Sequence, residues 1–391
     1  MKPIASSAEK TANGFSPTMC LAMRDSETLL IPGPVSVNQD VLAAVGRPVM
    51  AHYGDDWVAM YRRLTSSLAT IFGTQGDVFL LFGPGTAAIE ACLASTMAQG
   101  DELLVATNGM FGDRLVEVAQ GLNLRVHTIT TDGFGPIQPD HLSEGIREHP
   151  GASAFAVVHH ETSLGLLNPV RDLCMLARRH GLLTMVDAVA SLGGTQLEMD
   201  AWGIDLCAGV ANKALGAPVG VAPIAVGARG WAAVDDSRPK TAGWYLNLAT
   251  WRGYEEKWGT WHPSPTTMPT NSVVALAAAV EQVMARGLTA HQARFALAAA
   301  RVRDGLRELD FEMVIPQEHA SPLTTAVWGR KGMEVPDYME WMRRERGLRL
   351  GSGLGELAGR AFRIGHMGRA ADPDVVDAYL RGTADYVALD R

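Results

Sequence analysis

Apolar runs that end at turn residues alternate with segments of helical periodicity from residue 78 to residue 227. A short, continuous apolar run is typical of a strand that is buried on both faces of a parallel sheet. Strands that alternate with helices in this way predict an open, mostly parallel sheet and the α/β fold class. The strand-containing segments are residues 78–95, 102–120, 154–170, 182–186, 206–212 and 219–227.

Different patterns flank this alternating region. Residues 38–72 have the spacing of two helices joined by a loop, and residues 272–286 have that of a long connecting helix. We expect a flexible polar tail (1–27), a large domain (28–286) and a small α+β domain (287–391). The small domain is expected to contain helices at 293–309, 337–345 and 374–389 and strands at 311–315, 323–328 and 361–366.

Composition narrows the functional classes. The chain has 391 residues, of which 47% are hydrophobic and 19% charged, so it can bury a large core. A net charge of -8 without a basic stripe argues against nucleic acid as a partner. No apolar run is long enough to cross a bilayer, and the tail lacks the apolar core of a signal peptide. We therefore expect a cytoplasmic protein that does not bind membranes.

The cysteines support the same expectation. Cys20, Cys92, Cys174 and Cys207 are scattered, with neither CxxC pairs nor the spacing of a disulfide framework. Three of them lie in apolar contexts, which indicates core thiols in a reducing compartment.

Residues 182–218 contain the main candidate chemistry. Asp187 ends an apolar run, at the edge where α/β sheets bind ligands. Lys213 lies between apolar flanks, where burial disfavours the ammonium form and leaves a nucleophilic amine. Pyridoxal phosphate (PLP) chemistry needs an acid that protonates the pyridine nitrogen and a lysine that forms a Schiff base. Alternatively, Asp187 caps a helix and Lys213 packs its stem on the surface.

Two strand–turn–helix units add candidates for the same site. Gly83 and Gly85 allow close backbone approach, and Thr86 stands where a helix begins, which is a natural phosphate site. Phe111, at the start of the next helix, is placed to stack on a planar ring. Each feature also has a purely structural interpretation, as a tight turn and as a core aromatic residue.

A polar cluster at residues 159–163 follows another apolar strand. Its two histidines and one acid suggest a metal site. However, adjacent residues on a strand point to opposite faces, and no third ligand has suitable spacing. We expect no metal, and instead a hydroxyl or imidazole that contacts the ring oxygen of a cofactor.

Two segments are candidates for binding the substrate backbone or carboxylate. Prolines on either side of Gly33 force a fixed turn, which either enters the domain or lies across the mouth of the active site. Arg363 alternates with apolar neighbours and so faces away from them. A guanidinium in this setting suits bidentate capture of a carboxylate, or an interdomain salt bridge.

Aromatic residues are concentrated in two other places. The loop at 50–57 includes Tyr53 and Trp57, and loops of this composition often contact substrate. Residues 243–270 are rich in tryptophan and tyrosine, which suggests an interface or a lid. We expect donor specificity to depend on this loop and on residues 244–261.

From about residue 29 to the C-terminus, the chain resembles the class V aminotransferases, PLP enzymes of fold type I. It is most similar to the branch with alanine–glyoxylate, serine–glyoxylate and pyridoxamine–pyruvate aminotransferases. The resemblance implies a large, mostly parallel seven-stranded sheet with a smaller α+β domain. It rests on LIPGP, GPGTAAIEA, NGMFG, HHETSLG, VDAVASLGG, ANKALGAPVG and GSGLGELAGRAFRIGHMG, in this order.

The resemblance assigns the groups around the cofactor ring. Lys213 matches the Schiff-base lysine, and Asp187 matches the partner of the pyridine nitrogen. Val189 matches the residue packed under the ring, and Phe111 matches the aromatic residue stacked above it. Thr162 matches the hydroxyl near the ring oxygen.

The resemblance also assigns contacts to the phosphate and the substrate. Gly85, Thr86 and Asn212 match phosphate contacts. Thr267 matches a phosphate contact that relatives donate from the second subunit, which implies a homodimer with shared active sites. Arg363 matches the arginine that binds the substrate carboxylate, and we expect Gly33 and Tyr53 to lie beside it.

Some positions depart from the family pattern. Many relatives have a His-Arg-Ser run where residues 52–55 here are His-Tyr-Gly-Asp. Pyridoxamine–pyruvate aminotransferase also lacks that run, and it shares a His-His-acid-Thr cluster like residues 159–162. It has an acid where this chain has Pro84, however, and a second arginine where this chain has Leu354. These differences leave the amino donor open.

The sequence therefore predicts ping-pong transamination from a small amino donor to glyoxylate or pyruvate, in which Lys213 moves the proton. Pyridoxamine–pyruvate transamination is an alternative. A PLP lyase or desulfurase is disfavoured, because Cys92 is expected in a helix and Cys207 in a strand. The complete set of lysine, acid and arginine argues against a non-catalytic PLP-binding protein.

Overall fold

The computed structural model describes residues 27–389. The expected tail, apart from residue 27, and Cys20 lie outside the described residues. The chain folds around a seven-stranded sheet with the order β2-β10-β9-β8-β5-β3-β4. Its strands are β2 (Asp77–Phe82), β3 (Glu102–Ala106), β4 (Arg125–Ile129), β5 (Ala154–Val158), β8 (Leu183–Asp187), β9 (Leu206–Ala208) and β10 (Val221–Val226).

This sheet confirms the α/β fold class expected from the sequence. Strands β4, β3, β5, β8 and β9 are parallel, and β10 runs antiparallel to both of its neighbours. Strands β5 and β10 are buried along their whole length, which explains why their sequences are apolar without alternation. The register aligns Val158, Asp187 and Ala208, so the carboxyl ends of three strands meet at one edge.

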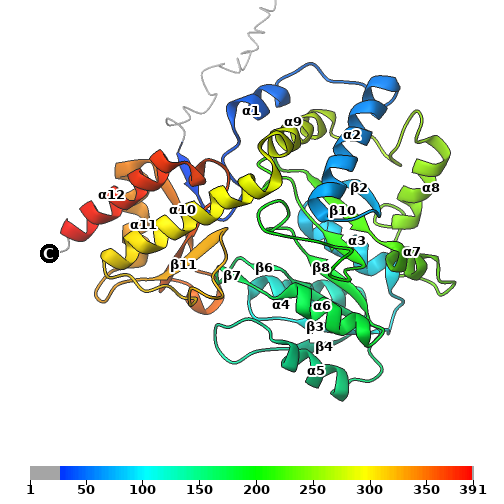
Figure 1. Ribbon diagram of the computed structural model, residues 1–391, viewed down its shortest axis with the longest axis horizontal. Helices are drawn as coiled ribbons and strands as arrows, with labels where there is room; N and C mark the ends of the chain where they lie inside the picture. Colours follow the sequence, from blue (N-terminus) through cyan, green and yellow to red (C-terminus); the bar gives the residue numbers. More distant parts are fainter. Residues whose placement is uncertain (1–26, 390–391) are drawn as a thin grey trace, which may run out of the picture.

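Helices cover this sheet on both sides (Figure 1). Helix α3 packs against β8, β9 and β10, and α6 packs against β5 and β8. The segment 121–153 supplies a strand and a helix (β4 and α5) that complete the alternating pattern. The helices of this part are α1 (Gln39–Val45), α2 (Asp55–Phe72), α3 (Gly85–Thr96), α4 (Met110–Gly121), α5 (Pro139–Glu148), α6 (Val170–Arg179), α7 (Ala228–Asp235), α8 (Leu248–Trp258) and α9 (Thr270–Arg286).

The C-terminal part contains a second sheet, with four strands in the order β1-β12-β13-β11, and helices pack on it. It lies beside the larger sheet (Figure 1). Its strands are β1 (Thr28–Leu30), β11 (Thr324–Trp328), β12 (Leu348–Ser352) and β13 (Ala361–Gly365). Its helices are α10 (Leu288–Glu308), α11 (Val335–Arg346), α12 (Pro373–Leu389) and the 3₁₀ turns η2 (Gly355–Leu357) and η3 (Gly368–Ala371).

Two details of this part differ from the sequence prediction. The expected strand at 311–315 is absent apart from a single bridge between Met313 and Val327, because the chain turns there. Strand β12 was not anticipated. It pairs in parallel with β1, so residues 28–30 belong to the C-terminal sheet and not to the larger sheet. We retain the division of the chain near residue 287 as a proposal.

The hydrophobic core supports that division. One cluster of buried side chains extends from Val41 to Val283 and fills both faces of the larger sheet. A second cluster joins Leu30 and Val35 to side chains from Phe295 to Val387. Helices α9 and α10 connect the two, and the chain bends by 90° between them at Gly287, where φ is +82°.

A short antiparallel hairpin, β6 (His160–Glu161) and β7 (Leu166–Leu167), projects from the end of β5 toward the C-terminal part. Leu166 bridges Ala320, and Ser321 N donates to Gly165 O at 2.8 Å. The hairpin is therefore one of the contacts between the two parts, and it lies near the edge at which β5, β8 and β9 end.

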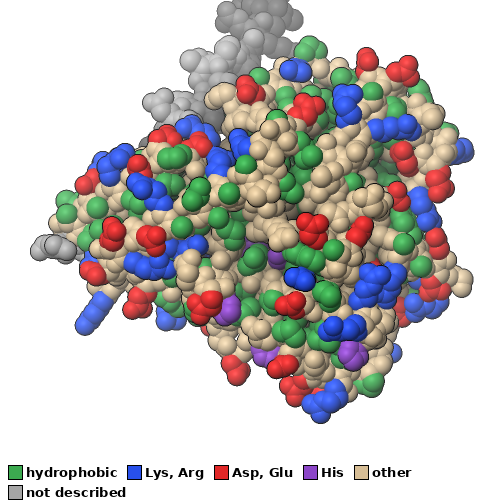
Figure 2. Space-filling view, in the orientation of Figure 1, with side chains coloured by type: hydrophobic (Ala, Val, Ile, Leu, Met, Phe, Trp, Pro, Cys, Tyr) green, Lys and Arg blue, Asp and Glu red, His purple; other side chains and the backbone are tan. Residues whose placement is uncertain are grey.

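Charged side chains of both signs are interspersed over the face shown in Figure 2. Among the described residues, no single helix has both the length and the apolar character of a membrane span. The pair α9 and α10 meets those criteria only when the two bent helices are counted together.

Candidate active site

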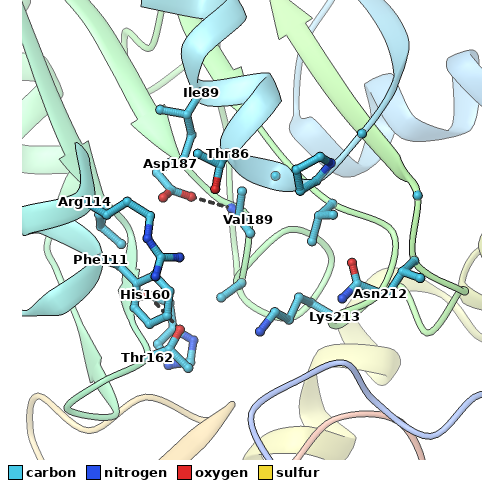
Figure 3. Close-up of a pocket in the computed structure, with 18 of the residues that line it drawn as sticks. Thr86, Ile89, Phe111, Arg114, His160, Thr162, Asp187, Val189, Asn212 and Lys213 are labelled. Atoms are coloured by element: carbon cyan, nitrogen blue, oxygen red, sulfur yellow. Dashed lines mark hydrogen bonds between the residues drawn. The ribbon is translucent and has the colours of Figure 1, made fainter. Parts of the chain in front are cut away.

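A cavity of about 590 Å³ opens at the edge where β5, β8 and β9 end. The starts of α3 and α4, the β6–β7 hairpin and the loop between β9 and β10 form its walls (Figure 3). The structure thus brings together residues that lie up to 138 positions apart, from residue 82 to residue 220. The sequence-predicted residues that line it are Gly85, Thr86, Phe111, Thr162, Asp187, Val189, Asn212 and Lys213.

Asp187 is the last residue of β8, and its side chain is buried. Its Oδ1 accepts a hydrogen bond from the backbone N–H of Val189 at 2.8 Å. No helix follows Asp187, so it is not a helix cap. Burial raises the pKa of this carboxyl from 3.8 to about 6, while the Val189 N–H and the charge of Lys213 oppose the shift. The acid therefore holds a proton more readily than an exposed aspartate does.

Lys213 lies in the loop between β9 and β10, five residues beyond the end of β9. Its Nζ donates a hydrogen bond to the carbonyl oxygen of Pro32 at 2.8 Å. In Figure 3 the side chain extends across the cavity toward Thr162 and His160. Burial, followed by the nearby charge of Arg363, lowers the pKa of the amine from 10.5 to about 8. A substantial fraction of the amine is therefore neutral near pH 8.

Gly33 lies directly against this amine. A Cβ atom built on Gly33 would lie 2.5 Å from Nζ and Cδ of Lys213, and the φ angle of Gly33 is +127°. Only glycine adopts that backbone angle without strain. Of the two interpretations of the residue 28–37 turn, the structure favours the segment that lies across the active-site mouth.

The start of α3 is open toward the cavity. Pro84 precedes the helix, and no side chain caps its first N–H groups. Gly85 is required there, because a Cβ atom would lie 2.5 Å from Cγ2 of Val189. Thr86 and Asn212 project toward the same region (Figure 3). Free N–H groups, a hydroxyl and an amide at a helix start form a suitable receptor for a phosphate group.

Phe111 and Arg114 lie on one face of α4, three positions apart. The guanidinium carbon of Arg114 lies 4.9 Å from the centre of the Phe111 ring. Glu161 fixes this helix, since its buried carboxylate accepts hydrogen bonds from the backbone N–H groups of Phe111 and Gly112, both at 3.1 Å. Burial raises the pKa of Glu161, and hydrogen bonds from Ser163 oppose that shift.

Arg363 lies on β13, just outside the cavity lining. Its Nη1 donates to Thr162 O at 3.0 Å and its Nε to Ser352 O at 2.8 Å. Among the described residues, no carboxylate accepts a hydrogen bond from it, so the interdomain salt bridge considered above does not form. Burial lowers its pKa to about 10, and the charge of Glu161 opposes the shift. The guanidinium is a buried cation bonded to neutral carbonyl groups.

Two expected residues lie away from this chain's own cavity. Tyr53 is 47% exposed, and its ring centre lies 5.3 Å from that of Trp261. Thr267 is exposed in the segment before α9. Trp57, expected to influence donor choice, is fully buried at the start of α2 and packs near Tyr61. Its expected role is therefore wrong, because the side chain belongs to the core.

Arg114 is a cavity residue that the sequence did not single out. Its spacing from Phe111 was the available signal, because residues three apart share a helical face. The other lining residues are mostly apolar, among them Ile89, Ala190 and Val210.

The groups that line the cavity fit PLP. Val189 and Phe111 provide apolar surfaces on which a planar ring can pack, and Asp187 offers a buried carboxyl group. The uncapped start of α3 and the amine of Lys213 provide sites for a phosphate and a carbonyl carbon. Among the described residues, no group of three or more His, Cys, Asp or Glu side chains is placed to hold a metal ion.

Comparison with known proteins also points to a PLP enzyme. The family model for aminotransferase class V matches residues 37–367. A Synechococcus protein named soluble hydrogenase, small subunit, is 32% identical over 361 residues, which cover 91% of this chain and 92% of the relative.

Solved structures superpose over nearly the whole chain. Alanine–glyoxylate aminotransferase from Nostoc is 30% identical with a TM-score of 0.87 and covers 91% of this chain and 94% of its own. Pyridoxamine–pyruvate aminotransferase from Mesorhizobium loti is 27% identical with a TM-score of 0.85, and the coverage is 94% of both chains. The chain therefore belongs to the class V aminotransferases, the PLP-dependent transaminases of fold type I.

Proposed function

We propose that the protein moves an amino group from a small amino donor to a 2-oxo acid, glyoxylate or pyruvate, by a ping-pong mechanism. The observation that carries the proposal is that Lys213 and Arg363 flank the same turn. Pro32 accepts the hydrogen bond from Lys213, and it packs on Gly351, beside the backbone of Arg363. An amine and a carboxylate receptor on either side of one turn suit a 2-oxo or 2-amino acid.

PLP, when bound, supplies an electron sink that stabilises negative charge on the substrate carbon. Asp187, whose pKa is raised to about 6 by burial, would face the pyridine nitrogen. Val189 and Phe111 would pack on the faces of the ring and exclude water. Gly85, Thr86 and Asn212 would hold the phosphate, and the Thr162 hydroxyl would bind the ring oxygen.

Lys213 carries the proton in both halves of the reaction. Its neutral amine would accept the proton from the donor's Cα, and its ammonium form would then act as the general acid. The same two transfers run in reverse with the 2-oxo acid. A pKa of about 8 suits both directions, because each form of the amine is populated near neutral pH.

Arg363 binds the carboxylate of donor and acceptor in turn. A buried guanidinium whose hydrogen-bond acceptors are carbonyl oxygens keeps its positive charge available for an anion. Because Gly33 has no side chain, it leaves room for the substrate between Arg363 and Lys213. Several similar proteins are named for glyoxylate or pyruvate, including alanine–glyoxylate, ureidoglycine–glyoxylate and pyridoxamine–pyruvate aminotransferases.

We further propose a homodimer in which Thr267 reaches the cavity of a second copy. Phe82 and Val219 line the cavity and are apolar, yet they are 52% and 59% exposed. A second chain would cover them and bring an exposed threonine to the phosphate region. Tyr53 lies on an exposed surface where it would meet the donor in that second cavity.

Pyridoxamine is a second candidate for the amino donor. The Mesorhizobium japonicum pyridoxamine–pyruvate transaminase is 28% identical over 350 residues. This chain also buries its His-His-Glu-Thr cluster at the cavity wall, with His160 and Thr162 both in the lining. Pro84 and Leu354 stand where that enzyme has charged residues, which favours a small amino acid as the donor.

Desulfurase chemistry is not supported. Such an enzyme needs a mobile thiolate, whereas Cys92, Cys174 and Cys207 are fully buried in the core. Burial raises the pKa of each thiol. Among the described cysteines, none lines the cavity.

A half-reaction tests the proposal. PLP-loaded protein would be mixed with alanine, serine or aspartate, and apo-protein with pyridoxamine, while the cofactor absorbance is recorded. A change with one donor that glyoxylate or pyruvate reverses would support the proposal and name the donor. If no donor produces a reversible change in protein that binds PLP, the proposed reaction is wrong.

A further inference from the structure

A second cavity, of about 200 Å³, lies where α10 packs against α9 and η3 (Figure 1). Residues 214–216, which directly follow Lys213, form part of its wall. The rest of the wall comes from residues 36–41, from the two helices and from η3. Among the described residues, none lines both this cavity and the active-site cavity, so the two are separate sites.

This second cavity is lined by more positive than negative charge. Arg286, Arg294 and Arg369 contribute guanidinium groups, and Asp372 contributes the one carboxylate of the described lining. Asp372 is shared, since its carboxylate lies 2.6 Å from Arg294 Nη2 and 3.5 Å from Arg369 Nε. Arg369 also lies 4.0 Å from Asp374, which is outside the lining. Three guanidinium groups and one carboxylate leave the wall with a net charge of +2.

Arg286 has hydrogen-bond donors that remain unused. Its Nη1 lies 2.9 Å from Nδ1 of His291, and it forms no ion pair within residues 27–389. The residue is exposed, so a ligand from solvent reaches its guanidinium group. A guanidinium carries five N–H donors in a fixed fork that matches the oxygens of an oxyanion. Most of these donors are available at Arg286.

His291 connects Arg286 to the active-site loop. Its ring is buried, and its Nε2 lies 3.0 Å from the carbonyl oxygen of Ala214, the residue after Lys213. A carbonyl oxygen can only accept, so Nε2 carries the ring proton. Burial lowers the pKa of His291 to about 4, and the charges of Arg286 and Arg294 act in the same direction. The ring is therefore neutral at pH 7, and its Nδ1 accepts the hydrogen bond from Arg286.

We propose that this cavity binds a phosphate group, as inorganic phosphate or as a phosphomonoester, on Arg286, Arg294 and Arg369. A phosphate group carries a charge of about −1.5 to −2 at pH 7, which neutralises the charge of the wall. Its oxygens can accept from several guanidinium groups at once, whereas a single carboxylate would balance only half of that charge. The bound anion would hold Arg286 in place and, through His291, the loop that follows Lys213.

Calorimetric titration of the PLP-loaded protein with inorganic phosphate tests the proposal, because the phosphate of PLP then occupies its own site at the start of α3. We expect saturable binding with a dissociation constant of about 1 mM or tighter. Arg286→Gln and Arg369→Gln should each weaken it about 10-fold or more. The matched control is Arg301→Gln on α10, which removes a 60% exposed guanidinium that pairs with Asp377 outside the cavity and should leave the affinity unchanged.

No saturable binding up to about 10 mM phosphate would overturn the proposal, as would an equal loss of affinity in Arg301→Gln. The substrate site is tested separately with Arg363→Gln. A loss confined to that variant would place the ion at Arg363 and also overturn the proposal, whereas unchanged affinity supports it. Should Arg286→Gln fail to fold, Arg369→Gln still decides.

The source of the phosphate group is identified by titrating glycerol 3-phosphate in the same way. Tighter binding than inorganic phosphate identifies a phosphorylated metabolite, and weaker binding identifies the free ion. Loss of both affinities in Arg286→Gln is expected in either case. All of these affinities are measured without turnover, so failure of the transamination proposal would be seen separately.

Discussion

Arg363 Nη1 donates a hydrogen bond to the carbonyl oxygen of Thr162 at 3.0 Å, across 201 positions of sequence. The bond joins β13 of the C-terminal part to the hairpin segment at the cavity wall. The proposed receptor for the substrate carboxylate is thus held by the residue that is proposed to bind the cofactor's ring oxygen. Docking of the two parts and formation of the substrate site are therefore coupled.

The Arg363→Lys variant tests this receptor. Lysine keeps the charge but loses the planar fork, and we expect the KM for the 2-oxo acid to rise about 10- to 100-fold while PLP affinity is unchanged. Arg349→Lys, on the neighbouring strand β12 with its side chain 48% exposed, is the matched control. An unchanged KM in Arg363→Lys would remove this arginine from the substrate site.

The Lys213→Ala variant tests the catalytic lysine. We expect turnover to fall by at least about 10²- to 10⁴-fold, because no other lysine within residues 27–389 lines the cavity. The visible absorbance of bound PLP should also disappear. The control is Lys331→Ala, which removes an exposed lysine of the C-terminal part. Persistence of the absorbance in Lys213→Ala would contradict the assignment.

Asp187 makes the stability of the apo-protein depend on pH. Its pKa is about 6 in the folded protein and 3.8 when exposed, so between these values the folded state binds more protons than the unfolded state. Stability contributed by this group therefore falls as pH rises from about 4 to 6. Asp187→Asn should gain about 2–3 kcal/mol relative to the unmodified apo-protein between pH 4 and pH 7.

Denaturant unfolding at pH 4, 5.5 and 7 would measure this gain. Asp132→Asn, at an exposed position, is the control and should show no comparable trend. A constant difference between Asp187→Asn and the unmodified protein at all three pH values would show that burial does not raise the pKa of Asp187.

Gly33 is expected to tolerate no side chain. Gly33→Ala places a Cβ atom 2.5 Å from Nζ of Lys213 and strains a backbone at φ +127°. We expect activity to fall at least about 10-fold and stability by about 1–3 kcal/mol. Gly332→Ala, at φ +84° with open space around it, carries the backbone strain alone. Equal activity in the two variants would show that Gly33 does not set the position of Lys213.

The sequence predicted six of the seven strands of the larger sheet, because each of these six is a local apolar run between turn residues; it missed β4 (Arg125–Ile129), an edge strand that is mostly polar. It also identified Asp187 and Lys213, since an acid and a lysine stand out against apolar neighbours. The same reasoning could not assign β1, whose partner β12 lies more than 300 residues later. Such pairing depends on tertiary packing, which leaves no local pattern.

In the candidate site, too, the residues whose placement depends on tertiary packing could not be predicted from the sequence. Phe111 was identified by its position, but Arg114 required knowledge of which face of α4 borders the cavity. Trp57 looked like a loop residue by composition, yet it lies in the first turn of α2 and is fully buried. His160 Nδ1 lies 3.4 Å from Ser321 Oγ, 161 positions away, and no motif contains both residues.

The proposed transfer of an amino group is tested by following the nitrogen atom. Alanine labelled with ¹⁵N would be incubated with glyoxylate and the PLP-loaded protein, and the products analysed by mass spectrometry, with serine and aspartate tested in the same way. Ping-pong transamination should place the label in glycine, form the donor's 2-oxo acid in equimolar amount and give parallel lines in double-reciprocal plots. Release of the label as ammonia, or no transfer from any of these donors to glyoxylate or pyruvate, would contradict it.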